Sequence, residues 1–243
     1  MYGWRGRIGV IVPCVNTTTE FEFNTLAMAV PGISVHCARM HLEFGDTLTK
    51  EALLDMHNHS AGTAVTELAH AKVNVIVYAC TSGSFVGGPE WDRGIIEKIE
   101  KQTGIPTITT STSVVKALHY LNVSRIAVGA PYDESVTLLG VKFLEESGFI
   151  VVKHLALDNI ESVVSGVSSD LAYKLGRRVN SKEADCVFIS CTQFPTIDVI
   201  GSLELDLVKP VISANSASFW YALRSLSINS DLSTYGKLFS SDL

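Results

Sequence analysis

The sequence predicts an α/β protein of two lobes, each a doubly wound parallel sheet, related by a pseudo-twofold axis with the active cleft between them. Three observations predict this fold. Short apolar segments rich in β-branched residues alternate with segments of helical character, and the whole series occurs twice. In each copy a Cys-Thr pair, at residues 80–81 and 191–192, ends one of the apolar segments. Buried parallel strands have this continuous apolar pattern, and helices connect them.

The first copy contains four expected strands with helices between them. Residues 7–13 and 75–80 are continuous apolar runs typical of buried strands, whereas residues 33–39 alternate as a strand near a sheet edge does. An apolar stripe through Leu53, Val65 and Leu68 predicts a long helix. The strands are expected over residues 7–13, 33–39, 75–80 and 104–111, and the helices over 21–26, 48–71 and 91–103.

The second copy repeats this order. Gly148 ends a predicted helix, as glycine often does at a helix C-terminus. No element is assigned between the third and fourth strands of this copy, and the tail after residue 228 is polar with weak periodicity. The strands are expected over residues 125–131, 149–157, 187–191 and 209–214, and the helices over 114–121, 135–147, 169–180 and 219–226.

The two copies align over three segments. Residues 8–13 match 126–131 at an offset of 118, the Cys-Thr pairs match at an offset of 111, and residues 106–111 match 210–215 at an offset of 104. The order is preserved, so loop lengths alone account for the shrinking offset. We therefore expect two flavodoxin-like lobes, one of residues 1–112 with 215–243 and the other of residues 113–214.

Composition excludes several classes of protein. A hydrophobic fraction of 47% with 18% charged residues is typical of a packed globular chain rather than a disordered one. The net charge of −6, with no basic cluster longer than Arg177-Arg178, argues against nucleic-acid binding. No apolar run approaches the roughly 20 residues that span a bilayer. The N-terminus enters a strand directly, unlike a signal peptide, and the five cysteines form no CxxC pair, so we expect reduced thiols in a cytoplasmic protein.

Cys80 and Cys191 are the candidate catalytic residues. Both are expected at the carboxyl end of a strand, where open α/β sheets bind ligands, and they occupy equivalent points of the repeat. Polar residues and amides follow each cysteine, and such donors favour the thiolate over the thiol. Cys37 and Cys186 lie in or beside strand patterns and are expected to be small buried hydrophobes. Cys14, in the first loop, is left unassigned.

Other polar residues stand at strand ends and are expected to converge on the same cleft. For Asn16 and Asn215, capping of a loop is as good an interpretation as contact with a ligand. For Tyr132, packing of the aromatic ring is an alternative to a role in binding. Neutral donors of this kind suit a small dianion. No glycine-rich nucleotide motif and no lysine at a strand end is present, and His57 and His59 point apart on a helix, so no cofactor or metal is expected. The further strand-end residues are Thr110, Ser111, Asp133 and Asn159.

These motifs resemble the Asp/Glu racemase superfamily, and within it the maleate cis-trans isomerases. The two Cys-Thr pairs are characteristic of the superfamily, and the segment 78–84 with Asn16 and Pro131-Tyr132 is similar to the isomerase branch. Arylmalonate decarboxylases are similar in fold but have only the second cysteine. The matching segments are residues 13–16 with Glu20, 78–84, 109–111, 131–132, 190–192 and 213–215 with Trp220 and Leu223-Arg224.

The resemblance implies a cofactor-independent isomerase that converts maleate to fumarate. Cys80 would be the nucleophile that forms a covalent succinyl-type adduct, and Cys191 would exchange the proton. A homodimer is expected for the superfamily. One alternative stays open, a two-cysteine racemase or epimerase of an acidic amino acid or a hydantoin, while a non-catalytic two-lobed binding protein fits the paired cysteines poorly. The expected substrate-binding residues are Asn16, Thr81, Ser82, Tyr132, Asn159, Thr192 and Asn215.

Overall fold

The computed structural model of the chain describes residues 2–41, 50–157 and 167–240. Its N-terminal half alternates strands and helices as the sequence predicts. The elements are β1 (Gly6–Pro13), α1 (Thr18–Met28), β2 (Ile33–Met40), α2 (Lys50–His70), β3 (Val75–Tyr78), α3 (Thr81–Phe85), α4 (Gly88–Thr103), β4 (Thr107–Thr109) and α5 (Thr110–Tyr120).

The C-terminal half follows the same order and ends in two short 3-10 helices. The elements are β5 (Arg125–Ala130), α6 (Glu134–Glu146), β6 (Ile150–Ala156), α7 (Ser169–Val179), β7 (Cys186–Ile189), α8 (Ile197–Leu207), β8 (Val211–Ser213), α9 (Ala214–Ser225), η1 (Ser233–Tyr235) and η2 (Lys237–Phe239).

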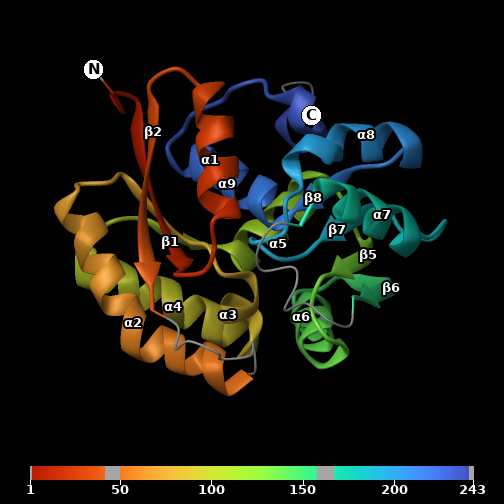
Figure 1. The fold of residues 1–243 in the computed structure, drawn as a ribbon, viewed down its shortest axis with the longest axis horizontal. Helices are drawn as coiled ribbons and strands as arrows, with labels where there is room; N and C mark the ends of the chain where they lie inside the picture. The colour runs from red at the N-terminus through yellow and green to blue at the C-terminus, as the bar shows by residue number, and fades with distance from the viewer. Residues whose placement is uncertain (1, 42–49, 158–166, 241–243) are drawn as a thin grey trace.

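The strands form two four-stranded sheets with one topology. The order is β2-β1-β3-β4 in the first sheet and β6-β5-β7-β8 in the second, and every pairing is parallel. In Figure 1 the first sheet lies with the red to yellow elements and the second with the green to blue ones. The identical strand order confirms the predicted pair of doubly wound parallel sheets.

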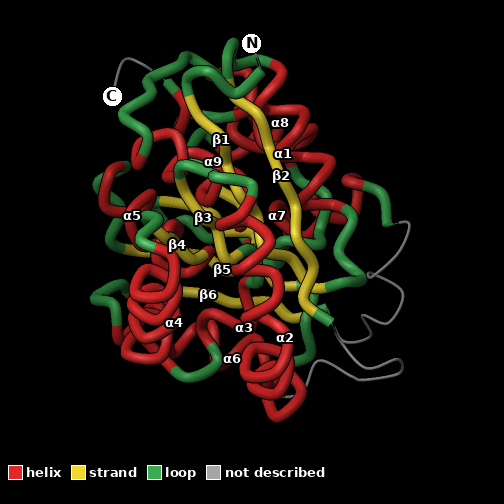
Figure 2. The backbone as a smooth tube through the Cα atoms, turned by 90° about the vertical axis from the view of Figure 1, so that its left-hand side faces the viewer, coloured by secondary structure: helices red, strands yellow, loops and turns green. Residues whose placement is uncertain are grey.

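Helices cover both faces of the sheets, as parallel sheets require. Figure 2 shows strands enclosed by helices on either side, and in the N-terminal half α2 and α4 pack on one face while α1 and α9 pack on the other. One buried apolar cluster reaches from Ile8 and Val77 in the first sheet to Val128 and Phe188 in the second. The two sheets therefore share a core. Among the helices that the structure describes, none is long and apolar enough to cross a membrane.

Two helices connect the halves. α5 follows β4 and α9 follows β8 without a loop, and the two helices pack against each other. α9 also packs on α1, β3 and β4, so the last α-helix of the described residues returns to the N-terminal half. The division at residues 112/113 and 214/215 falls inside these two helices, and it stays a prediction.

The structure differs from the sequence-based elements at several boundaries and in the three features that follow. The segment after Cys80, expected to be a polar loop, is the short helix α3, and α8 stands where no element was assigned. The predicted fourth strand of the first copy ends two residues early, because Thr109 caps α5 by accepting a hydrogen bond from the Thr112 amide at 3.0 Å. The helix therefore begins at Thr110, so Thr110 and Ser111 are helical.

The shared core predicts that both halves unfold together. Leu118 of α5 is fully buried in the shared cluster, so Leu118→Ala should lower the free energy of unfolding by about 3 kcal/mol. Urea unfolding followed by circular dichroism and by fluorescence should give one coincident transition. Leu205→Ala, at a side chain that is 81% exposed, serves as the control and should change stability by less than about 0.5 kcal/mol. Two separate transitions would contradict the shared core.

Candidate active site

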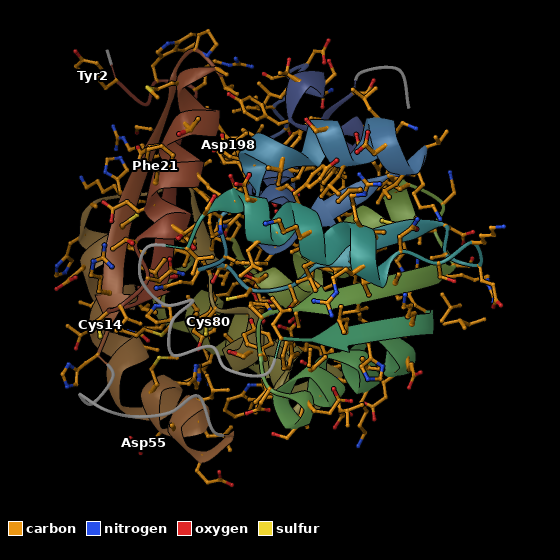
Figure 3. All side chains as sticks on the ribbon, turned by 45° about the vertical axis from the view of Figure 1, so that its right-hand side comes forward. Tyr2, Cys14, Phe21, Asp55, Cys80 and Asp198 are labelled. Atoms are coloured by element: carbon orange, nitrogen blue, oxygen red, sulfur yellow. The ribbon has the colours of Figure 1, made fainter. Side chains whose placement is uncertain are left out.

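The two candidate thiols lie just beyond the ends of equivalent strands. β3 ends at Tyr78 and β7 at Ile189, so Cys80 and Cys191 each stand two residues past a strand rather than at its last position. Figure 3 shows Cys80 near the middle of the molecule. Both residues are buried, with 4% of Cys80 and 9% of Cys191 exposed, so the candidate site is enclosed.

Cys80 lies at the N-terminus of α3 in an extended conformation. Burial raises the pKa of its thiol to about 11, while hydrogen bonds from the Gly83 amide and the Ser82 side chain act in the opposite direction. Gly83 is required by space. A Cβ on this residue would lie 2.9 Å from the Cys80 sulfur and 3.2 Å from the Tyr78 hydroxyl. The helix therefore approaches the sulfur closely enough to donate to it only because residue 83 is glycine.

Cys191 differs from Cys80 in its backbone. Its φ is 88°, a region that side-chain-bearing residues rarely adopt and that costs about 1–3 kcal/mol. Burial raises the pKa of its thiol, and hydrogen bonds from the Tyr132 hydroxyl and the amides of Gln193 and Phe194 oppose that rise. The strained turn thus places three donors around one sulfur.

Tyr132 joins the two thiols in one site. Its hydroxyl bonds to Cys191 and Ser190, and the charge of Cys80 acts on it as well. The charge of Cys191 also contributes to the raised pKa of Cys80, so the two sulfurs lie within electrostatic reach of each other. The structure therefore brings Cys80, Cys191 and Tyr132 together between the two sheets.

Thr81 offers a further donor beside this site. Its hydroxyl is buried and has no hydrogen-bond partner among the described residues. A small cavity of about 20 Å³ adjoins Thr81, Tyr132 and Ser190 and is otherwise lined mainly by apolar side chains. A larger cavity of about 380 Å³ is lined by Tyr120, Trp220 and Arg224, and neither thiol is among the lining residues of this cavity or of the smaller one.

Asn16 and Thr192 tie the two cysteine turns together. The Thr192 hydroxyl donates to the Ala79 carbonyl at 3.2 Å and accepts from the Asn16 amide at 3.1 Å. Asn16 also donates to the Thr19 hydroxyl and accepts from the Thr19 amide in the first turn of α1. Both amide hydrogens of Asn16 are therefore used within the protein.

Asn215 makes similar internal bonds. Its amide nitrogen donates to the Thr192 carbonyl at 2.9 Å and to the Glu22 carboxylate at 2.7 Å, and its oxygen accepts from the Thr19 hydroxyl. The sequence analysis missed Glu22, a carboxyl group with 2% exposure. The signal was available, because Glu22 shares the buried face of α1 with Thr19, Phe23 and Leu26.

The remaining candidates lie elsewhere or outside the described residues. Asp133 caps α6 by accepting from the Val136 amide at 2.9 Å. Cys186 is fully buried in β7. Cys37 is half-buried in β2, and burial raises the pKa of the Cys37 thiol to about 12. Cys14 is half-buried beyond β1. Asn159 lies outside the residues that the structure describes.

Comparison with known proteins finds matches over nearly the whole chain. The family model for arylmalonate decarboxylase matches residues 8–239. The chain is 30% identical to the maleate isomerase of Nocardia farcinica over 97% of this chain and 96% of that protein, and 31% identical to the maleate isomerase of Pseudomonas putida over 96% and 97%.

A solved structure repeats the fold across nearly the whole chain. A variant of the Nocardia farcinica maleate cis-trans isomerase with a covalently bound succinylcysteine intermediate aligns with a TM-score of 0.89 at 28% identity, covering 98% of this chain and 99% of that one. With the family model spanning both cysteine turns and these relatives matching over nearly their full length, the chain belongs to the family of arylmalonate decarboxylases and maleate isomerases.

Proposed function

We propose that this protein is a maleate cis-trans isomerase that forms fumarate through a covalent cysteine adduct. The observation that carries the proposal is the pair of buried thiols that share one site with Tyr132. The maleate isomerase relatives confirm the sequence-based prediction of an isomerase. The succinylcysteine in the Nocardia farcinica structure supports an adduct on a cysteine.

The reaction would begin with Cys80 as the thiolate. Its sulfur lone pair forms a bond to one alkene carbon of maleate, and the π electron pair moves onto the other carbon and its carboxylate. The Cys191 thiol then gives its proton to that second carbon. The product of this step is a succinyl adduct on Cys80 and a thiolate at Cys191, so charge and protons balance.

The second half reverses these steps after a rotation. The former double bond is a single bond in the adduct and can turn. The Cys191 thiolate removes a proton from the carbon that received one, the double bond reforms, and the bond to the Cys80 sulfur breaks to release fumarate. The pair holds one proton before and after turnover. Two thiols within electrostatic reach favour such a shared proton, because ionisation of one opposes ionisation of the other.

Neutral donors would hold the dianionic substrate. Thr81 has an unpartnered hydroxyl, Ser82 follows it at the start of α3, and burial raises the pKa of Tyr132 well above its usual value, which keeps its hydroxyl a donor. Asn159 remains a predicted contact. The other three predicted contacts would have to exchange an internal hydrogen bond for one to substrate. They are Asn16, Thr192 and Asn215.

We also infer a cytoplasmic homodimer that works without a cofactor. In the reaction described above, the two thiols supply the nucleophile and the proton, and hydrogen-bond donors hold the substrate, so no step requires a cofactor. Large apolar side chains on the surface of α1, Phe21 at 66% exposure and Met28 at 79%, support burial against a second copy. Sedimentation analysis of the purified chain measures the oligomeric state directly.

The two thiols should fail in different ways when replaced. Cys80→Ser should lower maleate turnover by at least about a thousandfold, because the nucleophile is lost. Cys191→Ser should also lose turnover but retain a succinyl adduct on Cys80, which adds the mass of one maleic acid, with the second carbon protonated by water. Fumarate absorbance and intact-protein mass spectrometry measure these outcomes. Cys37→Ser, outside the site, is the matched control. Racemisation of aspartate, glutamate or a hydantoin in place of maleate turnover would favour the two-base alternative.

Adding a methyl group beside the Cys80 sulfur should impair chemistry. Gly83→Ala places a Cβ 2.9 Å from that sulfur, so the thiolate must shift, and kcat should fall about a hundredfold. Gly94→Ala in α4 is the matched control, because its Cβ meets nothing within 4 Å and alanine favours a helix. Equal kcat values for both variants would show that the sulfur tolerates displacement.

Activity should depend on the ionisation of Cys80. Burial raises its pKa to about 11, so the thiolate fraction grows as the pH rises toward that value. We expect kcat/KM for maleate to increase between about pH 7 and about pH 9, by up to about tenfold for each unit. Initial rates in buffers of constant ionic strength test this expectation. A flat profile would mean that Cys80 is already fully ionised at neutral pH.

A further inference from the structure

A buried carboxylate from one half caps a helix of the other half. Glu22 of α1 accepts hydrogen bonds from the amides of Thr196 at 2.5 Å and Ile197 at 3.0 Å, through its Oε1 atom. These amides open α8, whose N-cap residue Thr196 provides no side-chain cap of its own. A helix N-terminus leaves such amides without partners, so Glu22 satisfies them from across the molecule.

The second oxygen of Glu22 leads toward the candidate site. Oε2 accepts from the Asn215 amide nitrogen at 2.7 Å, and that nitrogen also donates to the Thr192 carbonyl at 2.9 Å. Thr192 directly follows Cys191. A continuous chain of hydrogen bonds therefore runs from Glu22 through Asn215 to the cysteine turn.

The cysteine turn is a place that needs such support. A φ of 88° at Cys191 persists only where the surrounding structure fixes it. The Thr192 carbonyl is held by Asn215 and by the Thr19 hydroxyl at 3.0 Å, which fixes the peptide that leads to Gln193. The amides of Gln193 and Phe194 are the backbone donors to the Cys191 thiol.

We propose that Glu22 is a positioning residue for Cys191, holding through Asn215 the turn that aims the amides of Gln193 and Phe194 at the thiol. Its effect on turnover rests on the proposed isomerase function. Its effect on the thiol itself does not.

Only a carboxylate suits this place. Both oxygens of Glu22 accept hydrogen bonds. A glutamine has an NH₂ group in place of one of these oxygens, so this group would face another donor, either the Asn215 amide nitrogen or the α8 amides. Burial is the largest influence on Glu22 and raises its pKa to about 7, while its hydrogen bonds act in the opposite direction. A buried carboxyl group is costly to retain. The chain to Cys191 gives a reason for its presence.

The test compares the two thiols within the same protein. Glu22→Gln disturbs both the bonds to the α8 amides and the bond to Asn215, whereas Asn215→Ala removes only the connection to the Thr192 carbonyl. Thr196→Val removes the Thr196 hydroxyl, which contacts Glu22, but keeps the hydrogen bond from the Thr196 amide to Glu22. Each full-length variant, without substrate, is alkylated with iodoacetamide over a range of pH. Mass spectrometry of the peptides then gives separate rates for Cys80 and Cys191.

Positioning predicts an effect on one thiol. In Glu22→Gln and Asn215→Ala the pH midpoint for alkylation of Cys191 should rise by about one unit, a tenfold slower reaction at fixed pH, while that of Cys80 stays within about 0.3 unit. Thr196→Val should leave both midpoints unchanged. With maleate, kcat should fall about tenfold in Glu22→Gln and KM should change less than about threefold, because Glu22 is not among the predicted substrate contacts.

Several outcomes would overturn the proposal. Equal shifts of both thiols, or no shift at Cys191, would assign Glu22 to general stability, as would failure of both Glu22→Gln and Asn215→Ala to fold. If Glu22→Gln alone fails to fold, Asn215→Ala decides, because it retains the α8 cap. Absence of maleate turnover in the unmodified protein would overturn the proposed function but leave the alkylation result valid.

Discussion

The cost of ionising a sulfur in the protein interior governs this site. Burial is the largest influence on the pKa of both Cys80 and Cys191, and in each case it opposes the thiolate. The groups that offset this cost are neutral: backbone amides, serine and tyrosine hydroxyls. A nearby cation would lower the pKa further, but thiolate nucleophilicity falls as the pKa falls. Neutral donors therefore stabilise the thiolate while leaving it reactive toward carbon.

Duplication of the fold explains how two thiols meet in one site. Equivalent strands β3 and β7 end on opposite sides of the same site, so each half contributes one sulfur. The copies then diverge where chemistry requires a difference. Cys80 is extended at the start of a helix, whereas Cys191 occupies a strained turn with φ at 88°. This difference between the two turns suits the proposed roles of Cys80 as nucleophile and Cys191 as proton carrier.

The sequence could predict the sheets because short apolar runs rich in β-branched residues are typical of strands buried on both faces of a parallel sheet. It could not predict α8, whose apolar residues, including Leu205 at 81% exposure, surround the helix and hide its buried face. Thr110 and Ser111 were assigned to a strand on propensity, but capping by Thr109 starts a helix there. The cysteines were recognisable from their repetition. The spacing of α1 places Glu22 on the buried face of the helix, but its partners on α8 could not be predicted, because they lie about 175 residues away and only folding joins them.

The Thr192 hydroxyl connects the two halves of the site. Thr192 follows Cys191, and Ala79 precedes Cys80. The Thr192 hydroxyl donates a hydrogen bond of 3.2 Å to the Ala79 carbonyl, which joins the two cysteine turns across the halves. The same residue receives Asn16 on its hydroxyl and Asn215 on its carbonyl. In the proposed reaction the substrate rotates about its central bond while the two sulfurs must keep their places. The partners of Thr192, namely Ala79, Asn16 and Asn215, are all buried, which favours a proposed reaction in which the rotation takes place in the substrate rather than in the cysteine turns.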